Sequence, residues 1–256
     1  MANQRKERGL LDKKRLRGLE AESAPTGYQY GWPSGGTSEP DVIEQFVFDV
    51  ASGNLTGTVL GTTLTPTGSP TFEVDSSSYS PSMAKSIKYG SNLGHRVLSA
   101  QSAFDRAAGE DFTIEWVARR PSTDTGFCAS WSLNGAASTT AYGIIVYHLN
   151  ATGLSFYFRV EDGSYVGADW TIPNHADDTF HKYRLVADRS GNAELFFDGV
   201  SKGTAAMASV NAKGTVNTAV RMGEQYNSGG DNWPGELVEW RMSGNLTNNS
   251  GGPGGG

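Results

Sequence analysis

The sequence has a single cysteine, Cys128, among 256 residues. One cysteine can form neither an intrachain disulfide nor a cysteine-based zinc cluster. The surrounding segment FCASW is apolar, which favours a small buried side chain over a reactive thiol. A core region of about 200 residues buries roughly 70% of its unfolded surface, and a domain of that size does not need disulfides.

Long apolar runs are also absent. No stretch approaches the ~20 consecutive apolar residues of a membrane-spanning helix. The first twenty residues are charged and lack the apolar centre of a signal peptide. We therefore expect no membrane association, and we expect synthesis and folding in a cytoplasm, where Asn-x-Ser/Thr triplets are ordinary polar turns.

The residue patterns of common catalytic sites are missing too. The four histidines are scattered without metal-ligand spacing, and no Ser/His/Asp arrangement or glycine-rich phosphate loop is present. Retaining glycoside hydrolysis needs two carboxylates about 5–5.5 Å apart. The nearest candidates are Glu110 with Asp111 and Glu236 with Glu239. Adjacent side chains diverge, and a spacing of three places side chains on opposite faces of a strand. We predict that the protein is not an enzyme; a degenerate glycoside hydrolase is an alternative.

Short segments of alternating apolar residues fill the chain from Val42 to Gly244. His181–Gly199 holds two such runs, KYRLVA and AELFF, separated by the turn residues RSGN, which predicts an antiparallel hairpin. Phe112–Ala118 has the cleanest alternation in the chain, and Ile144–Tyr147 is a continuous apolar run expected of a central strand. About ten or more such segments with turn signals between them indicate an all-β fold, a β-sandwich or jelly roll.

The two ends of the chain differ from this central region. Residues 1–23 form a basic arm, because residues 1–20 hold seven basic and three acidic side chains while the remaining 236 residues carry a net charge of −10. Residues 24–41 are a Gly/Ser/Pro-rich linker, residues 42–244 the domain, and residues 245–256 a flexible Gly-rich tail.

The arm and linker are the candidate docking segment of the chain. We predict that the arm orders on an acidic protein surface; a solvated terminus is the alternative. No aromatic residue is interleaved with the basic ones, which argues against nucleic acid. The aromatic cluster YQYGWP in the linker either inserts into a neighbour or folds back on its own domain. The candidate docking residues are Arg5, Lys6, Arg8, Lys13, Lys14, Arg15, Arg17, Tyr28, Tyr30 and Trp32.

Four segments together resemble a known family. DFTIEW, GLSFYF, FHKYRLVAD with AELFFDG, and WPGELVEWRMSG occur in the order seen in the laminin G-like branch of the concanavalin A-like lectin/glucanase jelly rolls. Phe180 replaces the family's usual Trp, and Glu236–Glu239 replaces Ile-Asp-Glu. The closing segment is similar to the ends of laminin G-like domains found in bacteriophage virion proteins. The resemblance implies a concanavalin A-like jelly roll. It says little about function, because lectins, glycosidases and adhesion modules all have this fold.

The resemblance also suggests a role and partners. We expect a non-enzymatic structural or decoration protein of a virion, docked through its N-terminal arm to a major capsid or tail protein. The domain would face outward, with host-surface glycans as a further hypothetical partner, and a homo-oligomer is expected of such an appendage. A free-standing carbohydrate-binding lectin is the alternative.

Laminin G-like modules often carry calcium at the rim of the sandwich, although no cofactor is required by the sequence. Loop carboxylates and amides supply the oxygen ligands that calcium prefers. Asx turns are the favoured alternative for the same residues. The candidates are Asp124, Asp177, Asp178, Asp231 and Asn232.

A glycan site would need exposed aromatic rings with polar neighbours. Trp233 in SGGDNWPG is the first candidate, because a Trp flanked by Gly, Asp and Pro is not expected in a core. Its polar neighbours would be Tyr226, Asp231 and Asn232, and Trp170 is the second choice. A loop ring fixed against the sandwich edge is the alternative for Trp233.

Overall fold

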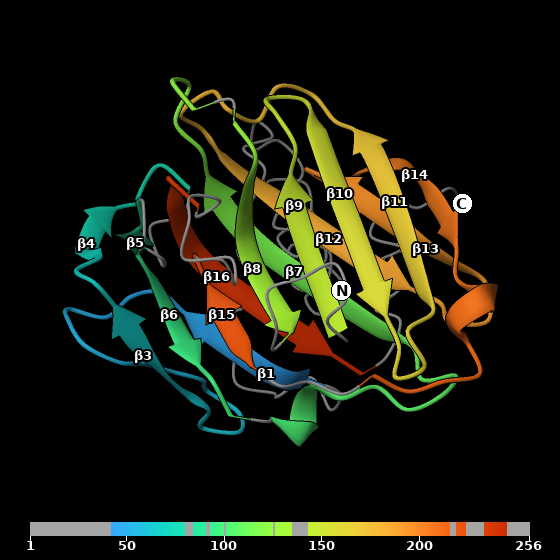
Figure 1. The fold of residues 1–256 in the computed structure, drawn as a ribbon. Helices are drawn as coiled ribbons and strands as arrows, with labels where there is room; N and C mark the ends of the chain where they lie inside the picture. The colour runs from blue at the N-terminus through green and yellow to red at the C-terminus, as the bar shows by residue number, and fades with distance from the viewer. Residues whose placement is uncertain are drawn as a thin grey trace, which may run out of the picture. The chain divides into compact units, whose positions relative to one another are not determined.

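The computed structural model describes residues 42–79, 84–90, 93–99, 101–124, 126–134, 143–215, 219–223 and 233–244. These residues form two antiparallel sheets of eight strands each, packed face to face (Figure 1). In Figure 1, strands β9–β11 of one sheet lie in front of β12 and β7 of the other. The predicted all-β jelly-roll sandwich is confirmed. The predicted arm, linker and tail lie outside the described residues.

Sheet I carries the hairpin predicted at His181–Gly199. Its strands, in spatial order, are β14 (Val200–Ala206), β13 (Asn192–Phe197), β12 (Phe180–Ala187), β7 (Phe112–Arg119), β16 (Glu236–Ser243), β5 (Lys85–Lys88) and β4 (Thr71–Asp75), with β1 (Val42–Val47) also paired to β16.

Sheet II lies opposite and carries the predicted central run Ile144–Tyr147. Its strands, in spatial order, are β11 (Tyr165–Thr171), β10 (Gly153–Arg159), β9 (Gly143–His148), β8 (Cys128–Asn134), β15 (Val220–Met222), β6 (Gly94–Val97), β3 (Thr63–Thr67) and β2 (Leu55–Thr56).

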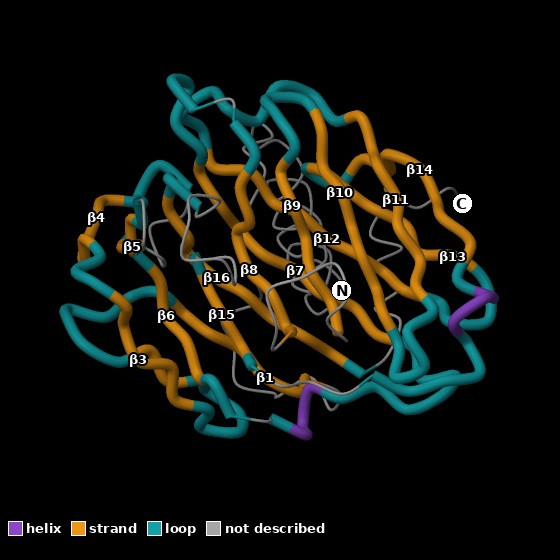
Figure 2. The backbone as a smooth tube through the Cα atoms, in the orientation of Figure 1, coloured by secondary structure: helices purple, strands orange, loops and turns teal. Residues whose placement is uncertain are grey.

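Helix is confined to short turns in the described part of the chain. The two 3₁₀ segments, η2 (Ser102–Phe104) and η3 (Ala208–Val210), are drawn purple in Figure 2, where the other coloured segments are strand or loop. None of the described helical segments is long and apolar enough to span a membrane.

The core between the sheets is unusually aromatic at its centre. Trp116 of β7 stacks on Tyr183 of β12 with ring centroids 4.9 Å apart, and meets Trp131 of β8 edge-on at 5.3 Å. Trp131 in turn contacts Trp240 of β16 at 5.9 Å. Since each fully buried side chain of this size contributes roughly 1.5–3 kcal/mol, these rings join the two sheets without any covalent link.

The strand β16 departs from simple alternation. Leu237 pairs with Ala118 and Glu239 with Val117, so Val238 is an extra residue that forms a β-bulge. Leu237 therefore faces the core beside Trp240. The bulge also changes which side chains of this strand share a face.

Candidate functional site

Four aromatic side chains form a row on the outer face of sheet II, which we call the aromatic row: Phe127, Tyr147, Tyr157 and Tyr165. Phe127 stacks on Tyr147 with centroids 4.7 Å apart and an interplanar angle of 26°. Tyr147 meets Tyr157 edge-on at 5.9 Å, and Tyr157 lies 6.5 Å from Tyr165. The row therefore extends from the segment before β8 across β9 and β10 to β11.

Strand alternation places these rings outside the core. Val146 and His148 face inward on β9, so Tyr147 between them faces outward. Tyr157 occupies the same position between Phe156 and Phe158 on β10. Tyr147 lies opposite Ser155, not opposite Tyr157, so the two rings are diagonal neighbours within reach of aromatic side chains.

A glycine makes room for the central ring of the row. Gly167 on β11 lies directly opposite Tyr157. A Cβ atom at Gly167 would lie 3.1 Å from Cε1 of Tyr157, closer than ordinary van der Waals contact. The phenol ring therefore lies close to the glycine backbone, and a Cβ atom at this position would require the ring to shift by a few tenths of an ångström.

The ends of the row are open to solvent. The exposed fractions are 42% for Phe127 and 59% for Tyr165, against 7% for Tyr147 in the middle. Tyr147 packs with Ala129 and Ile145 in a small apolar cluster separate from the main core. An apolar patch on an outer sheet face contributes nothing to the sandwich interior and is a common sign of a binding surface.

Polar groups lie directly beside the rings. Ser155, opposite Tyr147, donates a hydrogen bond to the carboxylate of Asp169 on β11, and Asp169 is exposed. Arg159 at the end of β10 places its guanidinium 5.9 Å from the Tyr165 ring centroid. Flat apolar rings beside a carboxylate and a guanidinium can pack against C–H groups while exchanging hydrogen bonds with hydroxyls.

The structure places the predicted glycan residues elsewhere. Trp233 has an exposed fraction of 0% and packs against His148 with ring centroids 4.5 Å apart. Its indole N–H donates to the carbonyl of Glu236 at 3.4 Å. Gly235 leaves room for the buried indole, because a Cβ there would lie 2.8 Å from Nε1 of Trp233 and 2.0 Å from the carbonyl oxygen of Arg119. The prediction of an exposed ring at Trp233 is wrong.

The other predicted glycan residues divide into two groups. Trp170 faces inward on β11, is 5% exposed, and packs on Phe156 at 6.1 Å, so it offers no ring face to a ligand and this prediction is also wrong. Tyr226, Asp231 and Asn232 lie outside the described residues. Sequence alternation could have found Tyr157, because it is the outward residue of GLSFYF, but nothing local indicates that three neighbouring strands and the segment before β8 align their rings.

A polar cluster that sequence reasoning missed lies inside the sandwich. His148 Nδ1 lies 3.1 Å from His175 Nε2, which also lies 3.1 Å from Arg120 Nη1. Arg120 has only N–H donors, so His175 Nε2 must be the acceptor in that contact. His175 Nε2 therefore carries no proton, and in its contact with His148 the proton must be on His148 Nδ1. The Ser130 hydroxyl, 3.0 Å from His148 Nε2, then donates to it. Residues distant in sequence thus form one relay of hydrogen bonds around neutral imidazoles.

Burial determines the titration of these imidazoles. Burial, followed by the charge of Arg120, lowers the pKa of His175 from 6.5 to about 3. Burial and the adjacent His175 and Arg120 lower the pKa of His148 well below 6.5. His181 behaves differently: burial lowers its pKa, but its contacts with Asp198 at 2.7 Å and Asp177 at 3.1 Å outweigh burial and raise it.

The described calcium candidates do not converge on one point. Asp124 pairs with Arg120 at 3.0 Å, and Asp178 accepts a hydrogen bond from the amide of Ser122 at 3.2 Å. Asp177 accepts the Thr179 amide at 2.9 Å, the geometry of an Asx turn. No group of three metal-ligating side chains occurs within the residues that the structure describes. Asp231 and Asn232 lie outside them.

The carboxylate pairs differ from expectation in one respect. Because of the bulge at Val238, Glu236 and Glu239 lie on the same outer face of sheet I rather than on opposite faces. Arg119 pairs with Glu236 at 2.6 Å, and Glu239 is completely buried. Burial raises the pKa of Glu239 to about 8, although a hydrogen bond from Gln45 acts in the opposite direction. A buried pair of this kind gives a substrate no access to the two carboxyl groups.

Glu110 and Asp111 diverge as predicted. Glu110 binds the Arg106 guanidinium at 2.7 Å, whereas Asp111 accepts the backbone amide of Arg189 at 2.7 Å. The two carboxylates therefore stabilise different segments and do not face each other.

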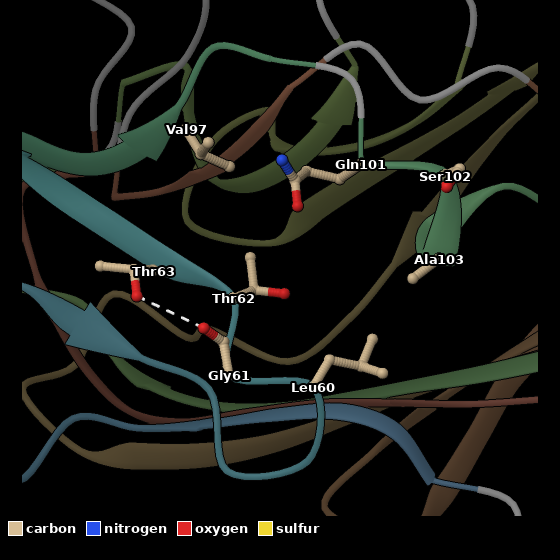
Figure 3. Close-up of a pocket in the computed structure, with 8 residues that line it drawn as sticks. All are labelled: Leu60, Gly61, Thr62, Thr63, Val97, Gln101, Ser102 and Ala103. Carbon is tan, nitrogen blue, oxygen red and sulfur yellow. Dashed lines mark hydrogen bonds between the residues drawn. The ribbon is translucent and has the colours of Figure 1, made fainter.

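A cavity of about 440 Å³ lies at the far edge of sheet II. Figure 3 shows its two sides, the segment leading into β3 and the segment that leads into η2. Glu44 fixes the segment that forms the first side, because its buried carboxylate accepts hydrogen bonds from the backbone amides of Val59 at 2.9 Å and Thr62 at 3.1 Å. The lining residues include no aromatic or charged side chain: Leu60, Gly61, Thr62, Thr63, Val97, Gln101, Ser102 and Ala103. The cavity thus offers weaker recognition groups than the aromatic row.

Comparison with known proteins shows the class of fold. No family model and no curated protein matches the sequence. Solved structures do match, and several of them are binding or receptor-binding domains of protein toxins rather than catalytic ones. At 9–13% identity the likeness concerns the fold alone.

Three of the similar structures illustrate the likeness. The botulinum neurotoxin serotype G binding domain has a TM-score of 0.62 at 12% identity over 81% of this chain and 49% of its own. The binding domain of Paraclostridial Mosquitocidal Protein 1 has a TM-score of 0.62 at 13% identity over 82% and 50%. The binding domain of botulinum neurotoxin DC in complex with SialylT has a TM-score of 0.60 at 10% identity over 81% and 48%. The chain thus spans about half the length of each.

Proposed function

We propose that the domain is a non-catalytic, lectin-like module that binds a glycan on the aromatic row. The row itself carries this proposal. Two of its rings, Phe127 and Tyr165, are exposed at 42% and 59%. The exposed carboxylate of Asp169 lies nearer the middle of the row, opposite Ser155, which in turn lies opposite Tyr147. A sugar ring has one face of C–H groups and a rim of hydroxyls, which matches flat rings flanked by hydrogen-bonding groups.

The similar structures support a binding role of this kind. One is a neurotoxin binding domain in complex with SialylT, and another belongs to a type C neurotoxin whose cell entry depends on interaction with two ganglioside molecules. Those ligands belong to those proteins. They support the proposal only in that this chain shares a fold with about half of each of those two chains.

Glycan-array binding followed by calorimetric titration tests the proposal. We expect Tyr157→Ala and Tyr165→Ala each to weaken binding by about tenfold, since one aromatic contact contributes roughly 0.5–1.5 kcal/mol beyond its buried area. Phe196→Ala is the matched control, because Phe196 lies on sheet I, under the Arg184 guanidinium at 4.1 Å. Wild-type protein that binds no glycan, or tyrosine variants that bind like the control, would show the proposal to be wrong.

We further propose that the module is a virion component anchored by residues 1–41 to a capsid or tail protein. The support is sequence alone: the basic arm, the linker and the resemblance to laminin G-like domains of bacteriophage virion proteins. None of the toxin structures described above is named as a laminin G or bacteriophage protein, and the expected homo-oligomer and virion location likewise stay predictions.

Co-sedimentation with assembled particles tests the anchoring. The full chain should sediment with particles, and a chain lacking residues 1–40 should not. Loss of the full chain at modest salt would assign the contact to the arm's ion pairs, which salt screens beyond about 8–10 Å. A full chain that never sediments with particles but binds glycan would favour a free-standing lectin instead.

A further inference from the structure

The outer face of the β10–β11 hairpin carries an exposed carboxylate. The outward residues of β11 include Tyr165, Gly167 and Asp169, and all three are exposed. Val166 and Ala168 between them pack against the core, as alternation along a strand requires. Because Gly167 has no side chain, no side chain of β11 separates the carboxylate of Asp169 from the ring of Tyr165 on this face.

Strand pairing sets Asp169 close to the half-buried ring of Tyr157. β10 and β11, which lie side by side in Figure 1, pair Ser155 with Asp169 and Tyr157 with Gly167. Tyr157 and Asp169 are therefore diagonal neighbours on one face, a relation that spans roughly 7–8 Å in an antiparallel sheet. The Tyr157 ring also leans toward β11, because its Cε1 lies 3.1 Å from the position of a Cβ at Gly167. One sugar unit that covers this ring can therefore reach the carboxylate with the hydroxyls on its rim.

The carboxylate of Asp169 is oriented and still has acceptor capacity. The hydroxyl of Ser155, which is completely buried, donates a hydrogen bond to Oδ1 of Asp169. An ionised carboxylate offers about four lone-pair sites on its two oxygens and has no proton to donate. Ser155 uses one of these sites, so the carboxylate can accept further hydrogen bonds. A group that only accepts hydrogen bonds recognises donors, and the donors of a sugar are its hydroxyls.

We propose that Asp169 selects the ligand of the aromatic row, and that this ligand is an uncharged glycan. One sugar unit packs its C–H face on Tyr157, and two adjacent hydroxyls of the same unit donate hydrogen bonds to the Asp169 carboxylate. This rests on the proposed glycan-binding function. Hydrogen bonds to an ionised acceptor are about twice as strong as those between neutral groups, so the carboxylate discriminates among sugars that the ring alone would accept equally.

The same carboxylate disfavours acidic sugars. A carboxylate or sulfate on the stacked unit would bring a second negative charge close to Asp169, and like charges at short range oppose binding. The net charge of the chain, −6, has the same sign. Nucleic acid is disfavoured for the same reason, because its backbone would place phosphates beside the exposed carboxylate.

Titration with matched oligosaccharides tests the inference. Calorimetry compares tetrasaccharides of glucose, galactose and mannose with the uronic-acid tetrasaccharides of the same sugars and linkages. Wild type should bind the neutral member of at least one pair about tenfold more tightly than the acidic member. Asp169→Asn keeps the size of the side chain and an acceptor for the Ser155 hydroxyl but removes the charge. It should bind that neutral sugar about tenfold more weakly and lose the preference.

Asp162→Asn is the matched control, because it removes one negative charge from the same hairpin. Asp162 lies in the turn between β10 and β11, where its carboxylate accepts the amide of Ser164 at 2.8 Å, an Asx turn that asparagine also forms. The control should keep both the affinity and the preference of wild type. Equal thermal transitions of the three proteins would show that each is folded.

The outcomes separate the inference from the proposed function. Acidic sugars that bind wild type as tightly as neutral ones, or an Asp169→Asn variant that binds like wild type, would overturn the inference and leave the glycan function standing. Tighter binding of a glucosamine tetrasaccharide than of its N-acetylated form would overturn it in favour of a cationic amino sugar. Binding of no sugar at all would overturn both.

Discussion

Glu239 shows how burial changes a single carboxyl group. It is completely buried on β16, and its pKa rises to about 8 because desolvation penalises the charged form. The native state therefore holds a proton on Glu239 that the unfolded chain releases above its ordinary pKa of 4.5. Between these two values the native state binds more protons, so stability falls as pH rises.

Replacing Glu239 with Gln should remove this dependence. Glu239→Gln keeps an acceptor for the Gln45 amide but no longer titrates. We expect little change in the free energy of unfolding at pH 5 and a gain of up to about 3 kcal/mol at pH 7, since each pKa unit corresponds to ~1.4 kcal/mol. Urea denaturation across this pH range measures the difference. A constant difference between variant and wild type would contradict the assignment.

The two buried neutral histidines, His148 and His175, give stability the opposite dependence on pH: below pH 6.5 it should fall as the pH falls. His148 and His175 have pKa values lowered below 6.5, so their contribution is intact above pH 6.5 and is lost as pH falls toward about 3. His181, with a raised pKa, contributes stability below pH 6.5 that is lost as pH rises through its folded value. NMR titration should find His148 and His175 neutral at pH 5 while His181 is protonated. A protonated His175 at pH 5 would rule out the relay with Arg120.

At the scale of elements, the aromatic row depends on the register between β10 and β11. Gly167 lies opposite Tyr157 because the two strands pair without interruption from Gly153 to Arg159. Shifting the register by one residue would turn every ring of β10 to the other face. The row is thus a property of strand pairing rather than of any one strand.

Gly167→Val should disrupt the row without unfolding the domain. The valine Cβ would lie 3.1 Å from the Tyr157 ring and displace it, while valine itself is favourable in a strand. We expect the affinity for the glycan to fall by about tenfold, with a free energy of unfolding unchanged within ~1 kcal/mol. Thr171→Val, an exposed position on the same strand, is the matched control and should bind like wild type.

At the scale of the whole molecule, the described sandwich has a core of its own. Aromatic rings from both sheets fill it, and the described residues use no covalent link. A domain of this size and burial folds independently. The docking segment is therefore expected to be separable from the glycan-binding face.

Deleting residues 1–40 tests that separation. The shortened chain should unfold in a single transition with a midpoint within a few degrees of the full chain, about the shift produced by 1 kcal/mol in a domain of this size. Its affinity for an oligosaccharide should be unchanged. A collapse of either property would show that these residues belong to the domain rather than to a docking segment.

Local alternation was enough to predict most strands of the fold. In Phe112–Ala118 and in the first strand of the hairpin His181–Gly199, every second residue is apolar because one side of the strand packs in the core between the sheets. Burial alternates along β12, whereas both faces of β7 are buried. The same reasoning failed at β16, where Val238 forms a bulge that no residue type announces. Because of this one extra residue, Glu236 and Glu239 lie on the same face of the sheet, whereas opposite faces were predicted.

The sequence by itself determined the fold class, because many short apolar segments, most of them alternating, are separated by turn residues along the chain. It could not determine the candidate site. Trp233 lies in a polar segment yet is buried, since its environment is supplied by distant residues such as His148. Phe127, Tyr147, Tyr157 and Tyr165 each look like single outward residues. Only the pairing of β8, β9, β10 and β11 brings them into one row, because neighbours within a sheet are set by tertiary register and not by distance along the chain.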